Sequence, residues 1–281
     1  MATDTADGTL LVPVSNPETV ERLMDTAIDI ARGRSLRILA LHVVEVPAQI
    51  PLSEGHQLVE EDGEERGVLA EAEQRVADAD VPVETKLRYA RDVATGIVGA
   101  VGEHDADGLL LGWHGRPRRR DIILGSFIDR VLAEADCDVF VKRIRRPARD
   151  VDSILVPVAD GPHSDLAVDL AGTLAGEHDA ELRLVHVVGP EADDAAIESA
   201  TALLDESAAV LPEGFDVETD LLRSDHVPGA INDETAYHDL TILGASRDPF
   251  LRRKLVGSVA EGVGRSAASA VMLVRSKEEE K

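Results

Sequence analysis

Residues 109–126 read LLLGWHGRPRRRDIILGS, and this stretch combines three signals in a fixed order. The leucines predict the end of a buried strand, the next glycines predict a tight loop, and Gly125 and Ser126 open a helical pattern. Glycine lets a backbone approach an anion closely, and the amides at a helix N-terminus point toward it. The stretch therefore predicts a phosphate-binding loop between a strand and a helix. A glycine-rich turn that only packs the strand against the helix is the alternative.

The chain carries this arrangement twice, which indicates an internal repeat. The segment LVPV occurs at 11–14 and 155–158, and HVV occurs at 42–44 and 186–188, both with an offset of 144 residues. The later motifs recur with an offset of 132 residues, as Leu111-Gly112 and Leu243-Gly244, and as Gly125-Ser126 and Gly257-Ser258. The second copy is therefore 12 residues shorter, and we expect the missing residues to correspond to the proline-containing loop 47–55.

Apolar runs that alternate with helical periodicity predict the same element order in both copies. In the first copy we expect strands near 9–14, 36–44, 82–88, 108–112 and 138–143, and helices near 18–33, 58–79, 92–104 and 125–135. In the second copy we expect strands near 152–158, 180–188, 215–222, 239–244 and 270–275, and helices near 163–177, 192–210, 227–237 and 257–267. The predicted fold is α/β, with two tandem Rossmann-like domains at 1–146 and 151–277. Each has a five-stranded parallel sheet flanked by helices, because the apolar strand runs suit strands buried on both faces.

The composition is strongly acidic, with 54 Asp and Glu against 29 Lys and Arg and a formal net charge of −25. Such a charge repels nucleic acid, and we interpret it as a halophilic adaptation, since high salt screens the self-repulsion of an acidic surface. No apolar run reaches the roughly 18 residues of a membrane span, and residues 1–8 lack the features of a signal peptide, so a cytoplasmic location without membrane insertion is expected. The single cysteine, Cys137, excludes an internal disulfide and is expected to be buried.

The double repeat, the LVPV opening, the HVV strand and the Gly-x2-Gly-x9-Gly-Ser spacing together resemble the universal stress protein family over nearly the whole chain. The resemblance implies a fold like that of the adenine-nucleotide alpha-hydrolases in each domain, and the spaced glycines are similar to the family's ATP-binding signature. It also implies a regulatory or stress-response role, with ATP or AMP as ligand and Mg²⁺ accompanying ATP. The paired modules attached to amino-acid transporters are similar as well.

Carried over to this sequence, the resemblance implies a nucleotide site in the first domain, with the base near the first two strand ends and the phosphates on the glycine loop. Its residues are Pro13, Val14, Ser15, Val43, Leu111, Gly112, Gly115, Gly125, Ser126 and Phe127. A second candidate site comprises Pro157, Val158, Val187, Gly244, Arg247, Gly257 and Ser258.

The sequence departs from the family's pattern in two places. Ser15 and Ala159 stand where the family usually has an Asp that contacts the base, and only Ser15 can still hydrogen-bond through its side chain. Arg247 replaces the second glycine of the motif, so it would either neutralise a phosphate or fill the site. We therefore expect an intact site in the first domain and a degenerate or differently used site in the second.

Other notable residues have two interpretations each. The basic segments 116–120 and 252–254 either attract phosphate or make surface salt bridges. Trp113 either stacks on a base or, as we favour, is a partly exposed loop residue that covers the glycine turn. We expect His42 and His186 to be strand-end histidines satisfied by hydrogen bonds rather than catalytic groups.

The sequence contains no metal-ligand spacing, nucleophile elbow or P-loop lysine, so we expect a protein that is not an enzyme. The first hypothesis is a nucleotide-sensing regulatory protein. The alternative is a ligand-free dimerising scaffold that regulates a partner such as an amino-acid transporter. The strands at 138–143 and 270–275 would then pair the two halves as an internal pseudo-dimer, with a homodimer as a further option.

The acidic composition makes a prediction about salt. We expect the thermal midpoint of unfolding to rise steeply between low and molar salt, because screening removes self-repulsion in the compact state. Circular dichroism melts over a series of salt concentrations measure this. Melting that does not change with salt would contradict the halophilic interpretation.

Overall fold

The computed structural model describes residues 6–60, 63–113, 126–144, 151–212, 214–245 and 258–277. Contacts divide these residues into two compact units. The first unit contains residues 6–113 and 126–140, and the second contains residues 141–144 and 151–277. The boundary therefore falls within the last strand of the first copy.

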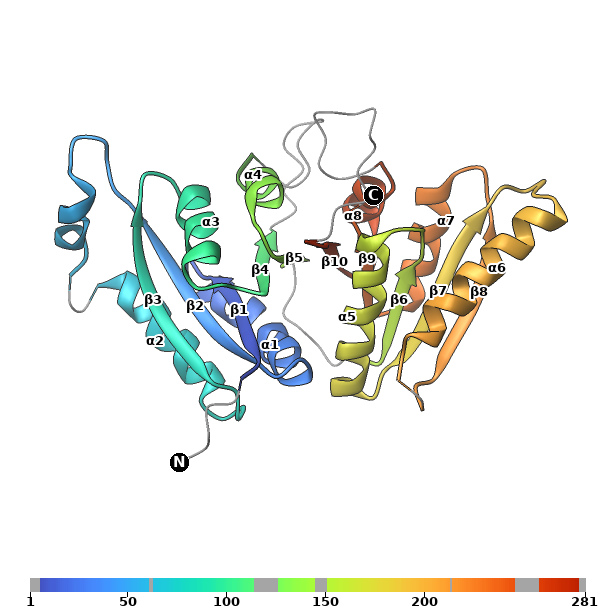
Figure 1. The fold of residues 1–281 in the computed structure, drawn as a ribbon, viewed down its shortest axis with the longest axis horizontal. Helices are drawn as coiled ribbons and strands as arrows, with labels where there is room; N and C mark the ends of the chain where they lie inside the picture. The colour runs from blue at the N-terminus through green and yellow to red at the C-terminus, as the bar shows by residue number, and fades with distance from the viewer. Residues whose placement is uncertain are drawn as a thin grey trace. The chain divides into compact units, whose positions relative to one another are not determined.

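The first copy has the predicted order of strands and helices (Figure 1). Its elements are β1 (Gly8–Pro13), α1 (Pro17–Gly33), β2 (Leu36–Glu45), the 3₁₀ helix η1 (Leu52–Leu58), α2 (Glu64–Val76), β3 (Val83–Ala90), α3 (Val93–Glu103), β4 (Gly108–Trp113), α4 (Ser126–Glu134) and β5 (Asp138–Arg143). The strand order is β3-β2-β1-β4-β5, with β1 parallel to both β2 and β4 and β2 parallel to β3.

The second copy repeats this plan. Its elements are β6 (Ser153–Pro157), α5 (Pro162–His178), β7 (Glu181–Val188), α6 (Asp194–Ala209), β8 (Val217–Arg223), α7 (Val227–Glu234), the 3₁₀ helix η2 (Thr235–Tyr237), β9 (Leu240–Gly244), α8 (Ser258–Ser266) and β10 (Ala270–Arg275). The strand order is β10-β9-β6-β7-β8, and β6 is parallel to β7 and β9. The structure thus confirms the predicted α/β class with two tandem Rossmann-like units.

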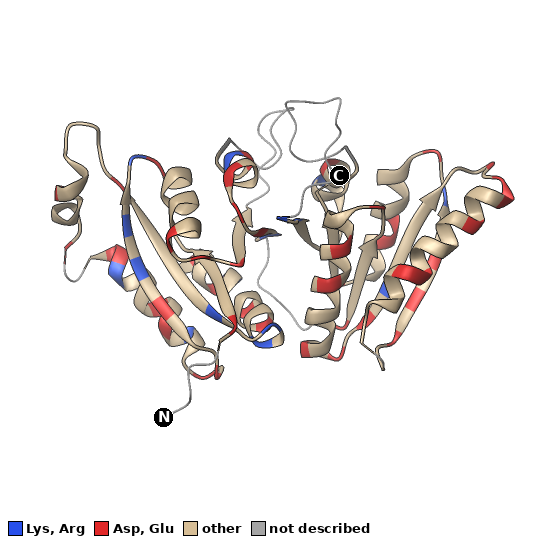
Figure 2. Ribbon diagram, viewed as in Figure 1, with Lys and Arg blue, Asp and Glu red and all other residues tan. Residues whose placement is uncertain are grey.

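Both faces of each sheet are covered, as the apolar strand runs predict. Leu10, Leu11 and Val12 of β1 are successive residues, so their side chains point to opposite faces, yet all three are fully buried. In the first unit α1 and α2 pack on one face of the sheet, while α3 and α4 pack against each other on the other. Cys137 is buried and not disulfide-bonded, as predicted. Figure 2 shows that charged residues lie on the helices, loops and outer strands, whereas the central strands β1 and β6 carry none.

Polar caps set where several helices begin. The side chain of Asp92 accepts a hydrogen bond from the Thr95 amide at 2.9 Å and so caps α3. Asn16 caps α1 in the same way through the Thr19 amide, also at 2.9 Å. Pro228 lies in the first turn of α7, where a missing amide proton costs nothing.

The helix predicted at 58–79 is shorter than expected and begins at Glu64. Leu58 instead ends η1, a separate 3₁₀ helix over Leu52–Leu58 in which Gly55 is buried. A Cβ atom on Gly55 would lie 2.8 Å from a methyl group of Val46 and 2.9 Å from the Tyr89 ring. This close tertiary contact holds η1 against β3, and helical periodicity alone does not report it.

The length difference between the copies lies where the sequence predicts it. In the first copy η1 stands between the end of β2 at Glu45 and the start of α2 at Glu64, whereas β7 ends at Val188 and α6 begins at Asp194. One nitrogen of Arg91 holds the longer segment. Its Nη1 donates to the carbonyl oxygens of Val46, Pro47 and Ile50, at 3.1, 2.6 and 2.9 Å.

The substitution Arg91→Ala tests this anchor. Three backbone carbonyls lose a charged donor, so we expect the segment 47–63 to open more often and to be cleaved several-fold faster by thermolysin. Mass spectrometry of the fragments locates the cuts. The matched control is Arg223→Ala in the second copy, where the guanidinium contacts the single carbonyl of Pro190 at 3.3 Å. Equal cleavage of the two variants would show that Arg91 does not anchor the segment.

Candidate functional site

The candidate site lies at the carboxyl ends of the parallel strands, where the strand order reverses. In the first unit β1 has β2 on one side and β4 on the other, and the chain after β1 enters α1. In open α/β sheets this switch point leaves a crevice in which ligands bind. The second unit has the same point between β7, β6 and β9.

The backbone of Val43 provides a donor and an acceptor at this crevice. The carbonyl of Leu41 accepts a hydrogen bond from Val14 at 2.8 Å on the β1 side, and Val46 donates to Ala90 at 2.8 Å on the β3 side. Successive residues of a parallel strand address alternate neighbours, so the N–H and C=O groups of Val43 face the β1 side. Because β1 ends at Pro13, these groups lie beyond its last residue, at the switch point.

The second unit reproduces this geometry. Val158 donates to the carbonyl of Val185 at 2.8 Å, so the backbone groups of Val187 face the β6 side. Since β6 ends at Pro157, the peptide groups of Val187 also lie beyond the neighbouring strand. The predicted residues Pro157, Val158 and Val187 are therefore brought together at the switch point, as are Pro13, Val14 and Val43.

Two histidines fix the turn that follows the central strand. The Nδ1 of His42 lies 2.9 Å from the carbonyl oxygen of Val14, and that of His186 lies 2.8 Å from the carbonyl oxygen of Val158. A carbonyl oxygen can only accept, so Nδ1 carries the proton in both rings. This confirms the prediction of hydrogen-bonded strand-end histidines.

The first turn of the following helix differs between the units. Ser15 is exposed, and its hydroxyl lies 3.2 Å from that of Thr19, which itself donates to Asn16. In the second unit the Ser164 hydroxyl accepts a hydrogen bond from the backbone of Ala159 at 2.9 Å. The position where the family usually has an Asp thus carries an exposed hydroxyl in the first unit, whereas in the second unit Ala159 is bound to Ser164 through its backbone.

The structure places part of the glycine motif. Leu111 and Gly112 lie in β4 just before its last residue, and Ser126 and Phe127 begin α4, with Phe127 half-buried. Gly115, Gly125, Gly257, Arg247 and the basic segments 116–120 and 252–254 lie outside the described residues, and Ser258 begins α8.

The prediction of a partly exposed loop position for Trp113 is wrong. Trp113 is the last residue of β4 and is 6% exposed. The strand runs one residue further than predicted, so Trp113 points to the same buried face as Leu111.

Gly244 has a packing role in the second unit. A Cβ atom there would lie 2.8 Å from the carbonyl carbon of His163 and 3.0 Å from the Ser164 amide nitrogen, both in the first turn of α5. The end of β9 therefore touches the α5 backbone directly. This contact is with α5 and not with α8, the helix that follows the glycine motif, so it is a packing role that the sequence did not predict.

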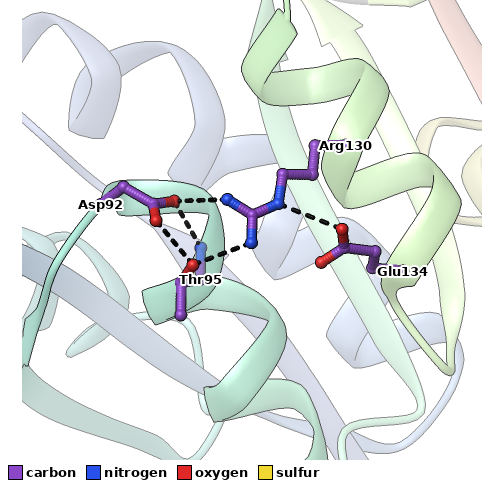
Figure 3. A network of polar contacts seen from close by, with 4 residues as sticks. All are labelled: Asp92, Thr95, Arg130 and Glu134. Atoms are coloured by element: carbon purple, nitrogen blue, oxygen red, sulfur yellow. Dashed lines mark hydrogen bonds and ion pairs between the residues drawn. The ribbon is translucent and has the colours of Figure 1, made fainter.

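A polar network that sequence reasoning missed ties α4 to the start of α3 (Figure 3). The guanidinium of Arg130 donates to Asp92 and Thr95, each at 3.0 Å, and to Glu134 at 3.1 Å. The hydrogen bonds from Thr95 hold the pKa of Asp92 below its usual value, and Arg130 adds to this effect. The spacing of Arg130 and Glu134 along one helix predicts their ion pair from the sequence alone. The contact of Arg130 with Asp92 could not be predicted in this way, because it joins two different helices.

This network has no counterpart at the same place in the second unit. Gly262 stands 132 residues after Arg130, and a Cβ atom on it would lie 2.7 Å from the Pro228 ring. The helices α7 and α8 are therefore held by close packing and by a hydrogen bond from Asn232 to the Gly262 carbonyl at 3.4 Å, whereas α3 and α4 are joined by charged side chains. Both arrangements set the position of the helix that follows the glycine motif.

Metal and membrane sites are not evident in the part of the chain that the structure describes. No group of three or more His, Cys, Asp or Glu residues there is arranged to hold a metal ion. Among the same residues no helix has both the length and the apolar composition needed to cross a bilayer.

The fold and the switch-point geometry define a tandem α/β protein of the Rossmann-like class. The sequence profile of the universal stress protein family matches residues 8–143 and 151–275. The chain belongs to the universal stress protein family, with one family domain in each half.

Similar proteins include both free-standing and transporter-linked ones. A universal stress protein from Archaeoglobus fulgidus superposes with a TM-score of 0.65 at 19% identity, over 97% of this chain and 98% of that one. The cytoplasmic domain of a prokaryotic cation chloride cotransporter superposes with a TM-score of 0.64 at 17% identity, over 97% of both chains. The Na⁺/H⁺ antiporter NhaS5 of Synechocystis is 28% identical over 181 residues, which is 64% of this chain and 26% of the antiporter. The chain thus spans about a quarter of that relative.

The contact at Gly244 makes a prediction about stability. We expect Gly244→Ala to lower the free energy of unfolding by about 1–3 kcal/mol, because its methyl group collides with the α5 backbone. Urea unfolding followed by circular dichroism measures the loss. Gly189→Ala is the matched control, since a Cβ atom on Gly189 meets nothing within 4 Å. Equal stability of the two variants would rule out a packing role for Gly244.

Proposed function

We propose that the first domain binds an adenine nucleotide, ATP or AMP, and that the protein acts as a nucleotide-dependent regulator. The observation that carries this proposal is the peptide of Val43, whose donor and acceptor lie at the switch point beyond the end of β1. Membership of the family and the intact Gly-x2-Gly-x9-Gly-Ser spacing support it.

An adenine nucleotide matches the groups at the carboxyl ends of these strands, with the base near the Val43 peptide and the phosphates near the glycine motif. Adenine presents a donor and an acceptor on one edge, which a strand peptide can match, and Ser15 adds a hydroxyl beside it. The glycine motif leads into α4, whose N-terminal amides favour phosphate oxygens. Arg130 would keep that helix end in position. Mg²⁺ would accompany ATP through the phosphates.

We propose binding rather than turnover. Slow hydrolysis needs a base or a cation placed at the transferred phosphate, and the sequence has no P-loop lysine to supply it. A bound nucleotide would instead attract the basic segment 116–120 through its phosphates and change the surface offered to a partner.

The second domain is proposed to be degenerate as a nucleotide site or to be used differently. Ala159 offers no side-chain hydrogen bond, and its backbone N–H is already taken by Ser164. Arg247 stands in place of the second glycine, where it would either neutralise a phosphate or fill the site.

A second candidate function is regulation of a membrane transporter through protein contact, without a ligand. The similarity to part of the antiporter NhaS5 favours this candidate. A transporter that co-purifies equally well with and without nucleotide would support it over nucleotide sensing.

The main test uses a reciprocal pair of variants. Calorimetry with ATP, AMP and adenosine should show one site per chain in the wild type. Gly115→Arg copies the second domain's residue into the first, and we expect nucleotide affinity to fall at least about ten-fold.

The reciprocal variant Arg247→Gly serves as the matched control and should leave the first site unchanged. Adenosine should bind more weakly than AMP, because it lacks the phosphate that the glycine loop would hold. Absence of nucleotide binding by the wild type, or unchanged binding by Gly115→Arg, would refute the proposed site.

A further inference from the structure

The turn between β3 and α3 is tied to two other parts of the first unit. Arg91 holds the segment 46–50 after β2 through three carbonyl oxygens, at 2.6 to 3.1 Å. Asp92, the next residue, accepts a hydrogen bond at 3.0 Å from Arg130 of α4 (Figure 3). Two consecutive residues therefore connect the helix that follows the glycine motif with the segment that carries η1.

The segment that carries η1 has few other contacts to hold it. Within η1, all of whose residues the structure describes, Gly55 alone is buried. The side chains of Leu52 and Leu58 are 44% and 40% exposed. A segment with so few apolar contacts opens easily, so its attachment depends on the hydrogen bonds of Arg91. A shift of the turn at Arg91 and Asp92 would therefore change how this segment lies on the surface.

The Arg130 side chain can hold or release α3 without losing all its partners. Its Nη1 and Nη2 donate to Asp92 and Thr95 of α3, whereas its Nε donates to Glu134 of its own helix. The guanidinium can therefore keep Glu134 when it leaves α3. The side chains of Arg130 and Asp92 are 42% and 43% exposed, so water can replace their contact at small cost. The link between the two helices thus has a closed and an open arrangement of similar free energy.

The parts of this connection occur together in one copy of the fold. In the described part of the second unit β7 is followed by α6 with no 3₁₀ helix between them. Three positions differ as well, because the strand registers and helix starts place Asp225, His226 and Gly262 where the first unit has Arg91, Asp92 and Arg130. The fold itself therefore does not require the connection, and its parts are expected to work together.

We propose that nucleotide binding in the first domain is coupled to the η1 segment, residues 46–59, through the contact of Arg130 with Asp92 and through Arg91. This inference rests on the proposed function and names the surface that the ligand changes. A phosphate held at the start of α4 fixes that helix, which lowers the entropic cost of keeping Arg130 on Asp92. The nucleotide then stabilises the turn and slows opening of the η1 segment. By linkage, the closed segment favours nucleotide binding by the same factor.

The test is hydrogen–deuterium exchange of the full chain with and without saturating AMP, at a salt concentration where calorimetry shows binding. The reporters are the amides of Ile50 and Glu54, which donate at 3.0 Å to the carbonyls of Pro47 and Pro51. We expect AMP to slow their exchange about two- to five-fold. Adenosine lacks the phosphate and should slow it less. The amides of 189–193, between β7 and α6, are the internal control and should not respond.

The variant Arg130→Ala should abolish this response, so that exchange of the η1 segment is the same with and without saturating AMP. Without any nucleotide, its η1 segment should exchange about two- to five-fold faster than in the wild type. Exchange of β1 reports overall stability and should not change. The matched control is Glu103→Gln, which removes an ion pair between α3 and Arg88 outside the connection and should keep the response.

Linkage also gives a reciprocal measurement. Arg91→Ala frees the η1 segment without altering the glycine motif, and it should weaken AMP binding about two- to five-fold. AMP binding by the wild type with unchanged exchange of the η1 segment would overturn the coupling and leave nucleotide binding intact. So would a response that persists in Arg130→Ala. Absence of nucleotide binding by the wild type would instead overturn the proposed function, and the coupling with it.

Discussion

Burial of both sheet faces is the constraint on which the rest of this structure depends. Leu10, Leu11 and Val12 are all fully buried, so the central strand has no face left for polar chemistry. Functional groups can then lie only at the two ends of the strands, where backbone and side chains emerge from the core. The Val43 and Val187 peptides lie at one of these ends, beyond the last residues of β1 and β6.

The duplicated fold separates what the architecture needs from what each copy has added. Both copies keep the histidine on the carbonyl after the central strand and the Asp that holds the start of that strand. They differ in how the helix after the glycine motif is held, by Arg130 in one copy and by the contact of Gly262 with Pro228 in the other. Each copy therefore serves as a reference for the other, because the shared contacts belong to the fold.

The sequence predicts the secondary structure closely wherever periodicity is strong. The strands expected at 138–143 and 270–275 have those bounds in the structure, and the duplicated motifs place the length difference between the copies correctly. Prediction fails where a distant contact decides the outcome. Gly55 is buried against Tyr89, which holds a 3₁₀ helix that the sequence did not predict, and Asp92 reaches Arg130 across 38 residues.

The candidate nucleotide site and its surroundings also show which features follow from the sequence and which depend on distant contacts. The ends of strands could be read from the sequence, and so could the residues that gather at the switch point, since topology brings them together. The hydrogen bonds of Arg130 to Asp92 and Thr95 could not, because they join helices that are not adjacent in the sequence.

The two strand-end histidines give the molecule a pair of built-in spectroscopic reporters. Each ring is locked in the Nδ1–H form by one carbonyl oxygen, at 2.9 Å for His42 and 2.8 Å for His186. If a turn opens or shifts, its ring loses that acceptor and is free to change tautomer, which alters the ¹⁵N frequencies of both nitrogens. Since each half has one such ring at the same place, motion at the two switch points can be followed separately in a single sample.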